Sequence, residues 1–264
     1  MFGLLGPNGA GKSSLIRILV TLLTPTTGKV SFNGFDLMKD RGEIRKILGY
    51  LPQDFRFFSK LKTWEFLDYA AGLAGITSKA LRREKVDEWL ERVGLFDARD
   101  RQANNLSGGM KRRLGIAQAL IGSPKIIIVD EPTTGLDPEE RIRFRNILSE
   151  LSQHDVIILL STHIVGDISS VCHDLALLNE GTLQFNGPPE VLIEKARGHV
   201  WQLQTAGVEY DMLKEKYAVT STIPTEDGWE IQLVGENLNL PASIQIEPNL
   251  EHAYVYFMES LTEL

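Results

Sequence analysis

The chain has 264 residues, of which 43% are hydrophobic and 24% charged, a composition that favours a packed core and excludes a mainly disordered protein. The formal net charge of −7, with no long Lys/Arg run, excludes the basic surface of a nucleic-acid-binding protein. A single cysteine, Cys172, excludes an intrachain disulfide and favours a reducing compartment.

Short β-branched segments alternate with helical stretches up to about residue 60. The pair Asn33-Gly34 predicts a tight turn between two strands. The predicted elements are a strand at Phe2–Leu5, a helix at Lys12–Leu22, and strands at Lys29–Phe32 and Leu48–Leu51.

Residues 63–121 differ from the alternating strands and helices before them, because their apolar residues recur at helical spacing with no strand pattern in between. The predicted helices are Trp64–Leu73, Lys79–Val93 and Met110–Ile121. We therefore expect a helical subdomain, at about residues 62–121, inserted into an α/β frame. The short basic cluster Lys111, Arg112 and Arg113 is interpreted as the solvated face of a helix.

Strand patterns return after residue 121 and alternate with helices. The predicted strands are Lys125–Val129, Val156–Leu160, Leu175–Leu178 and Leu183–Phe185, and the helices are Glu139–Leu151, Ile164–Val171 and Pro189–Ala196. Short, fully apolar strands that alternate with helices predict a mostly parallel sheet covered on both faces. The longest apolar runs are far below the ~20 residues of a membrane-spanning helix.

Residues 199–264 show shorter strands and loops rich in Thr, Pro, Asp and Asn. The predicted elements are strands at Val200–Gln204 and Trp229–Val234 and a helix near Leu250–Leu261. We interpret residues 1–198 as one α/β domain and 199–264 as a small α+β appendage without a chemical signature.

A glycine-rich loop between the first strand and the first helix fits the pattern G-x-x-x-x-G-K-[ST]. Its glycines let backbone N–H groups approach phosphate oxygens, and the helix N-terminus favours an anion. Lys12 brings a charge to the β- and γ-phosphates, and the Ser13 hydroxyl can ligate Mg²⁺. The loop is Gly6-Pro7-Asn8-Gly9-Ala10-Gly11-Lys12-Ser13. A capped glycine turn is the alternative, but the strand–loop–helix context favours a P-loop NTPase.

Two carboxylates follow the apolar run Ile126–Val129. Asp130 is placed to hold the shell of Mg²⁺, and Glu131 to polarise the attacking water. The alternative for this pair is an ordinary loop or a helix cap. Because the chain also carries a phosphate loop, the functional interpretation is favoured. His163 could contact the γ-phosphate, but a lone histidine after a strand is more often a structural residue. Gln53, which follows a predicted strand, could likewise be an ordinary loop amide.

A second glycine-containing turn, Leu106-Ser107-Gly108-Gly109-Met110, precedes a strongly helical stretch. Ser107 is a good N-terminal cap, and the glycines permit close backbone approach to an anion. One triphosphate already has its P-loop, so a second anion site is explained if it serves a nucleotide held by a partner chain related by two-fold symmetry. An ordinary capped turn is the alternative.

These motifs resemble the ATP-binding subunit of ABC transporters, particularly the exporter-type bacterial branch whose ATPase and membrane-spanning subunits are separate chains. The resemblance covers about residues 1–198, and motifs in this order are far more specific than any one alone. They are the Walker A loop Gly6–Ser13, the Q-loop Gln53, the signature Leu106–Met110, the Walker B segment Ile126–Asp130 with Glu131, the D-loop Gly135-Leu136-Asp137-Pro138 and the switch His163.

The resemblance implies an ATPase that uses ATP and Mg²⁺, with Lys12, Glu131 and His163 at its catalytic centre. It also implies that Ser107 and Gly109 contact ATP across a homodimer or heterodimer, and that Gln53 and the helical subdomain couple closure to a permease. The implied nucleotide contacts are Gly6, Pro7, Asn8, Gly9, Ala10, Gly11, Lys12, Ser13, Ser14, Gln53, Ser107, Gly108, Gly109 and Asp137, and the implied metal ligands are Ser13, Gln53 and Asp130.

Two departures from the family pattern stand out. Met110 replaces the usual Gln of the signature, but the cap and the glycines remain. Family members usually carry strands and an adenine-stacking aromatic before the Walker strand, whereas here Met1 falls almost on that strand. Because stacking contributes roughly 1–3 kcal/mol per base, we expect either a truncated start or weak nucleotide binding.

We therefore expect a subunit at the cytoplasmic face of the cell membrane that dimerises around ATP and powers transport, with export favoured. A soluble ABC-type ATPase acting on nucleic acid or ribosomes is one alternative, disfavoured by the acidic balance and the lack of a heptad insertion. A non-hydrolysing regulator is another, disfavoured by the intact Lys12, Asp130, Glu131 and His163 but kept open by the missing N-terminal strands. The transported substrate cannot be read from this chain.

Overall fold

The computed structural model describes residues 1–55, 60–236, 240 and 242–262, which form two compact units. Unit 1 comprises Met1–Val171 with Ala176–Phe185, and unit 2 comprises Cys172–Leu175 with Asn186–Leu264. The division at residue 198, drawn from sequence rhythm and family resemblance, stays a prediction. Among the residues that the structure describes, none of the helices combines the length and the hydropathy of a membrane span.

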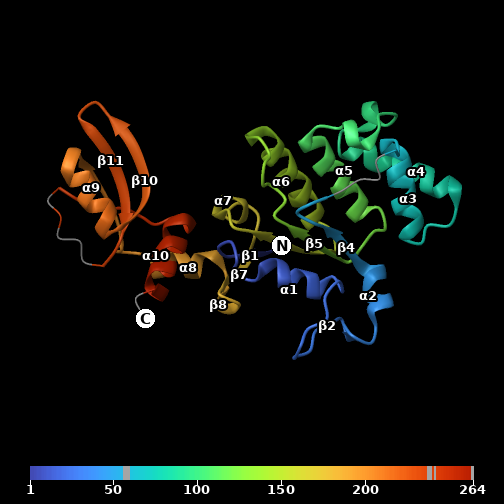
Figure 1. Cartoon of the computed structure of the whole chain (residues 1–264), viewed down its shortest axis with the longest axis horizontal. Helices are drawn as coiled ribbons and strands as arrows, with labels where there is room; N and C mark the ends of the chain where they lie inside the picture. The colour runs from blue at the N-terminus through green and yellow to red at the C-terminus, as the bar shows by residue number, and fades with distance from the viewer. Residues whose placement is uncertain (56–59, 237–239, 241, 263–264) are drawn as a thin grey trace. The chain divides into compact units, whose positions relative to one another are not determined.

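A six-stranded sheet lies at the centre of unit 1, with strand order β4-β5-β6-β1-β7-β8 (Figure 1). Neighbouring strands from β4 to β1 pair in parallel, which confirms the predicted mostly parallel sheet. Every residue of β5 is buried, as its unbroken apolar run predicts for a strand flanked on both sides. The strands are β1 (Phe2–Leu5), β4 (Leu48–Leu51), β5 (Ile126–Asp130), β6 (Ile157–Thr162), β7 (Asp174–Asn179) and β8 (Thr182–Gly187).

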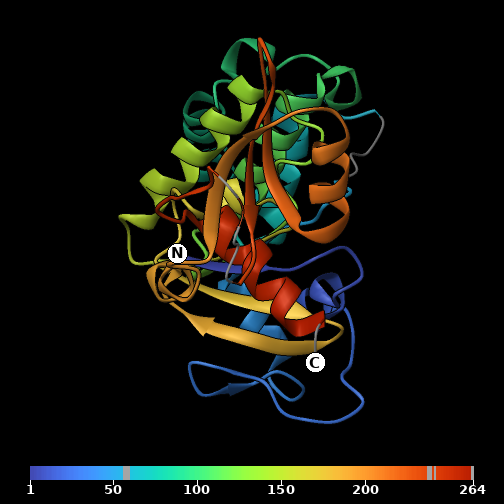
Figure 2. The same cartoon turned by 90° about the vertical axis from the view of Figure 1, so that its left-hand side faces the viewer.

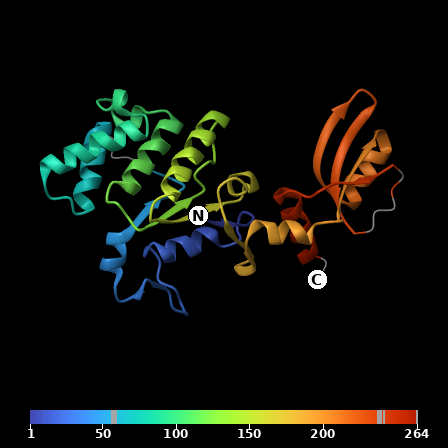
Figure 3. The same ribbon diagram turned by 180° about the vertical axis from the view of Figure 1, so that it is seen from behind.

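Helices cover both faces of this sheet, with α1 on one side and α5 and α6 on the other (Figures 1 and 3). Helix α1 (Lys12–Leu19) ends three residues earlier than predicted, because Thr21 adopts a left-handed φ of 64°. Its Ile16 packs in a core with Leu4 and Ile128. The remaining helices near this sheet are α5 (Gly108–Leu120), α6 (Pro138–Ser152) and α7 (Val165–Ile168).

The predicted helical subdomain is present between β4 and β5. It consists of α3 (Thr63–Leu73), α4 (Lys79–Arg92) and α5, with short 3-10 turns η1 (Phe96–Ala98) and η2 (Ala103–Asn105). The three α-helices contact one another. Helix α5 begins at Gly108, two residues earlier than predicted, because the Ser107 hydroxyl caps it by accepting from Met110 N at 3.2 Å.

The predicted turn at Asn33-Gly34 joins β2 (Ser31–Phe32) to β3 (Phe35–Asp36), and both turn residues have positive φ, 46° and 85°. The sequence did not predict α2 (Arg41–Ile47), which follows this hairpin. Because Ile44 is the only buried residue of α2, this helix has no repeating apolar pattern by which the sequence could identify it.

Unit 2 contains a four-stranded sheet in the order β10-β11-β9-β12, with α9 beside it (Figure 2). Its core includes Leu203, Leu213, Ile231 and Leu233. Helix α10 packs on α8 and also contacts β10 and β11. The elements are α8 (Pro189–Lys195), β9 (Val200–Thr205), α9 (Gly207–Lys216), β10 (Ala218–Thr225), β11 (Gly228–Val234), β12 (Ile244–Gln245) and α10 (Leu250–Thr262). The sequence did not predict α9, β10 or β12, because few of their residues are buried.

Candidate functional site

The P-loop connects β1 to α1 and needs glycine at defined points. Gly9 and Gly11 have φ of 86° and 101°, in the left-handed region that favours glycine. At Gly6 a Cβ atom would collide with the carbonyl oxygen of Leu178 on β7. The loop is therefore shaped by its own backbone and by the neighbouring strand.

Lys12 turns back over this loop and is 5% exposed. Its Nζ donates to the carbonyl oxygens of Gly6 (2.6 Å) and Pro7 (3.1 Å) and lies 3.5 Å from Glu131 Oε1. The ammonium thus bridges the P-loop and the segment after β5.

Glu131 follows β5 and is almost fully buried, at 4% exposure. Its Oε2 lies 2.6 Å from His163 Nδ1 and accepts a hydrogen bond from the Thr134 hydroxyl at 3.3 Å. Its φ of 48° is uncommon for a residue other than glycine, and such strain costs about 1–3 kcal/mol. The carboxylate therefore joins the ends of β5 and β6 at a strained backbone position.

Asp130, the last residue of β5, is 4% exposed, and its Oδ1 is buried without a hydrogen bond within the described part of the chain. Burial raises the pKa of the Asp130 carboxyl, and the charge on Glu131 adds to the rise. The nearby Ser161 and Ser13 hydroxyls and Lys12 oppose it. A buried carboxylate with an unused oxygen is a candidate ligand for a cation.

The P-loop, Gln53 and Glu131 enclose a cavity of about 200 Å³. Gln53 follows β4, the strand next to β5, so the parallel pairing brings both loops to the same edge of the sheet. The lining residues are Asn8, Gly9, Ala10, Gly11, Lys12, Ser13, Ser14, Gln53 and Glu131.

The signature segment and Asp137 do not line this cavity. Gly108 has open space where a Cβ would lie, but a Cβ at Gly109 would come within 2.6 Å of the Glu140 side chain. Asp137 caps α6, accepting from Glu140 N at 2.9 Å. Within the single chain these residues act as helix caps and packing points.

A buried carboxylate that the sequence analysis missed supports the loop of His163. Asp167 on α7 accepts hydrogen bonds from the Thr133 and Thr162 hydroxyls, and the Thr162 hydroxyl accepts from Ile164 N at 3.0 Å. It therefore joins the segments after β5 and β6. No sequence signal distinguishes it from an ordinary helical Asp.

The interpretation of Lys111, Arg112 and Arg113 as a solvated face is wrong for the two arginines, which are 8% and 7% exposed. Arg112 can be buried because it donates to backbone carbonyls. Arg113 can be buried because it donates to the Val93 carbonyl and pairs with the Glu140 carboxylate. Charge alone suggested a surface, and only the packing of α5 shows that Arg112 turns toward the loops after β4 and β5 and Arg113 toward the end of α4.

Comparison with known proteins gives the family. A family model described as ABC transporter matches residues 1–134. The ABC transporter ATP-binding protein YxlF of Bacillus subtilis is 37% identical, covering 83% of this chain and 72% of the relative. The probable multidrug ABC transporter ATP-binding protein YbhF of Escherichia coli is 39% identical, covering 74% of this chain but 34% of the relative.

Two solved structures support the same family assignment. An ATP-binding subunit of an ABC transporter superposes with a TM-score of 0.67 at 29% identity, covering 74% of this chain and 81% of that one. The subunit cbiO1 of Clostridium perfringens, described as part of the transporter complex cbiONQ, gives 0.65 at 30% identity, covering 74% and 79%. The chain has the P-loop NTPase fold and belongs to the ABC transporter family, as an ATP-binding subunit with ATPase activity coupled to transport.

Proposed function

We propose that the cavity beside the P-loop binds ATP, and that Glu131 is the general base that takes a proton from the attacking water. The observation that carries this proposal is the convergence of Lys12, Gln53 and Glu131 on one cavity. His163 holds one oxygen of the Glu131 carboxylate and so orients the base. It is also placed to donate to the γ-phosphate.

In this proposal Lys12 exchanges partners when ATP binds. In the structure its ammonium contacts two P-loop carbonyls and Glu131 Oε1. The β- and γ-phosphates are stronger partners for a cation, so Lys12 moves to them and leaves Glu131 free to accept a proton.

The donor set also fits Mg²⁺. Asp130 Oδ1 is buried and unused, and the Ser13 hydroxyl and the Gln53 amide are the other candidate ligands. The described residues contain no group of three or more His, Cys, Asp or Glu that could hold a metal without help. This suits a cation held largely by phosphates and water. When bound, Mg²⁺ neutralises charge on the phosphates.

We further propose that two ATP-binding subunits, identical or related, close around ATP. The capped N-terminus of α5, with Ser107, Gly108 and Gly109, lies outside the P-loop cavity and is suited to an anion. A head-to-tail dimer uses this second anion site on the nucleotide of the partner, and Asp137 at the start of α6 is proposed as a further contact.

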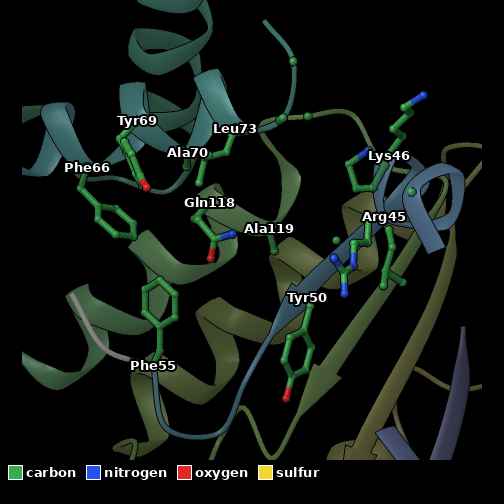
Figure 4. A pocket seen from close by; sticks show the side chains of 17 residues that line it. Arg45, Lys46, Tyr50, Phe55, Phe66, Tyr69, Ala70, Leu73, Gln118 and Ala119 are labelled. Atoms are coloured by element: carbon green, nitrogen blue, oxygen red, sulfur yellow. The ribbon is translucent and has the colours of Figure 1, made fainter. Parts of the chain in front are cut away.

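A groove of about 680 Å³ is the proposed docking site for a separate membrane-spanning permease. Figure 4 shows Phe66, Tyr69 and Leu73 of α3 on one side and Gln118 and Ala119 of α5 on the other. Tyr50 and Phe55, which also line it, flank Gln53 along the chain. A segment seated here therefore acts on the loop that lines the ATP cavity.

The proposed location is the cytoplasmic face of the membrane, and the proposed direction is export. The name of the Escherichia coli relative, a probable multidrug transporter protein, supports export. The cbiO1 neighbour, part of a transporter complex, supports association with other subunits.

Glu131→Gln tests the catalytic and dimer proposals together. ATP turnover should fall about 10²–10⁴-fold, the range for loss of a general base. With ATP and Mg²⁺, light scattering should show twice the 29.5 kDa mass of the chain. Glu139→Gln, which removes an 83% exposed carboxylate of α6, is the control and should keep full turnover. If Glu131→Gln kept the turnover of the parent chain, the assignment of Glu131 as the general base would be wrong.

The docking proposal is tested by Leu73→Asp, at a 73% exposed residue of the groove. The variant should be lost from the membrane fraction while the purified chain keeps its ATP turnover. Met212→Asp, at a 65% exposed apolar residue of α9, is the control and should stay with the membranes. Equal membrane recovery of the two variants would argue for docking elsewhere.

A further inference from the structure

Arg112 is a buried cation one helical turn after the start of α5. Within the described part of the chain its guanidinium donates four hydrogen bonds, all to backbone carbonyl oxygens. Nε donates to Pro132 (2.6 Å), Nη2 to Glu131 (2.6 Å), and Nη1 to Pro52 (3.1 Å) and Gln53 (2.9 Å). Its partners are main-chain groups that follow the ends of two strands.

The four carbonyls belong to two loops that matter for the proposed site. Pro52 and Gln53 follow β4 and belong to the segment called here the Gln53 loop. Glu131 and Pro132 follow β5 and belong to the segment called the Glu131 loop. Because β4 and β5 pair in parallel, their carboxyl ends lie side by side, within reach of one guanidinium. Arg112 therefore fastens the Gln53 loop to the Glu131 loop and both to α5.

Glu131 depends on such a restraint. Its φ of 48° lies in a region that side-chain-bearing residues rarely adopt. Its N–H donates to Ser161 O at 3.0 Å, and its carbonyl accepts from Arg112. The two bonds fix the residue between β6 and α5. If φ relaxed, the carboxylate would turn away from His163 and Lys12.

We propose that Arg112 is a positioning residue for ATP hydrolysis, which holds the Glu131 backbone in its left-handed conformation and in register with the Gln53 loop. Arg112 donates none of these bonds to the P-loop, which supplies most of the proposed phosphate contacts, so we expect it to change turnover more than nucleotide affinity. The inference rests on the proposed role of Glu131 as the base.

The chemistry requires arginine at this position. A guanidinium presents five N–H donors in a fixed planar fork, which can serve carbonyls of two loops at once. A lysine ammonium is a single point with three donors and cannot span the same acceptors. Lysine therefore keeps the charge but loses the link between the loops.

The test compares Arg112→Lys with Arg113→Lys. Arg113 is the next residue of α5 and similarly buried, but it donates to the Val93 and Gly94 carbonyls and pairs with Glu140, and it makes no hydrogen bond to the described residues of either loop. We expect Arg112→Lys to lower kcat about 10²-fold, as misplacement of a catalytic group does, with the KM for ATP within about threefold of the parent. Arg113→Lys should keep kcat within about threefold.

A second measurement separates positioning from general damage. In a Glu131→Gln background, Arg112→Lys should lower the residual turnover far less than in the parent, because the group that it positions is gone. Melting temperatures of both arginine variants show whether each is folded, and Arg112→Gln replaces Arg112→Lys if that variant is not. Equal kcat losses in the two arginine variants, a loss confined to KM, or an unchanged kcat would each overturn the inference. A parent chain without ATP turnover would instead overturn the proposed function.

Discussion

Asp130 is a buried carboxylate whose Oδ1 has no hydrogen-bond partner among the described residues. Because burial, and then Glu131, raise its pKa above the ordinary 3.8, the folded chain binds this proton more tightly than the unfolded chain does. The free energy of unfolding therefore falls as the pH rises from about 3.8 through the raised pKa. At neutral pH the ionised group is a net cost to stability.

Asp130→Asn should consequently raise the melting temperature of the nucleotide-free protein at pH 7, because a neutral amide costs less to bury than a carboxylate. Each kcal/mol corresponds to roughly 2–4 °C for a chain of this size. The gain should shrink as the pH approaches 3.8, where the carboxyl is protonated in both states. Melting curves between pH 4 and pH 8 measure this, and a lower melting temperature of the variant at pH 7 would contradict it. Turnover with Mg²⁺ and ATP should be lost in the same variant.

The motifs predicted that Lys12 and Glu131 serve the same nucleotide site, because a P-loop after β1 and a carboxylate after β5 reach the same edge of a parallel sheet, although β6 lies between the two strands. It could not predict the contact between His163 and Glu131, which depends on how the segments after β5 and β6 bend. Arg112 was missed for a different reason, since nothing in the run Lys111-Arg112-Arg113 shows which side chains α5 turns inward.

At the scale of elements, glycines set how closely β4 and α5 approach. A Cβ at Gly49 would collide with the carbonyl oxygen of Ala119, and one at Gly115 would lie 2.6 Å from Leu51 Cδ1. Both contacts lie between the helix that carries Arg112 and the strand that leads to Gln53. Close packing here keeps the signature helix and the Gln53 loop in a fixed relation.

Gly49→Ala should therefore destabilise the protein by about 1–3 kcal/mol, the usual cost of overpacking. Gly42→Ala is a matched control with the same chemical change, because Gly42 lies in α2 and has open space where the Cβ would stand. An alanine there should be neutral or stabilise by roughly 0.5–1 kcal/mol. Urea unfolding of both variants, compared at equal m-values, measures the difference. A stable Gly49→Ala would mean that β4 and α5 can move apart freely.

At the scale of the whole molecule, each unit has its own hydrophobic core, one around Ile16 and Ile128 and one around Leu203 and Ile231. In unit 2, His252 is 4% exposed and lies 3.0 Å from Gln232 Oε1 through Nε2, while Nδ1 accepts from Asn249 N at 3.3 Å. These contacts suit the neutral ring. Burial lowers the pKa of His252 below 6.5, and the charge on Glu251 opposes the shift.

The lowered pKa means that the unfolded chain binds this proton more readily, so unit 2 should lose stability as the pH falls below 6.5. We expect calorimetry to show two transitions, one that is acid-sensitive in this range and one that ATP raises by mass action, by about 2.7 kcal/mol at 100 times Kd. His252→Gln should abolish the acid sensitivity between pH 5 and pH 7. A single transition that ATP and acid shift together would contradict the separation of the units.

The sequence alone determined the chemistry of unit 1, the alternation of strands and helices around the P-loop, and the inserted helical subdomain, because buried parallel strands and phosphate loops leave local patterns that survive without coordinates. Half-exposed elements such as α2, α9 and β10 leave no such pattern, since few of their residues are buried. Only the tertiary structure showed that Arg112 joins the carbonyls of two loops 78 residues apart along the chain, from Gln53 to Glu131. A buried guanidinium and a strained φ are properties of packing, and packing depends on contacts between segments that a linear pattern does not bring together.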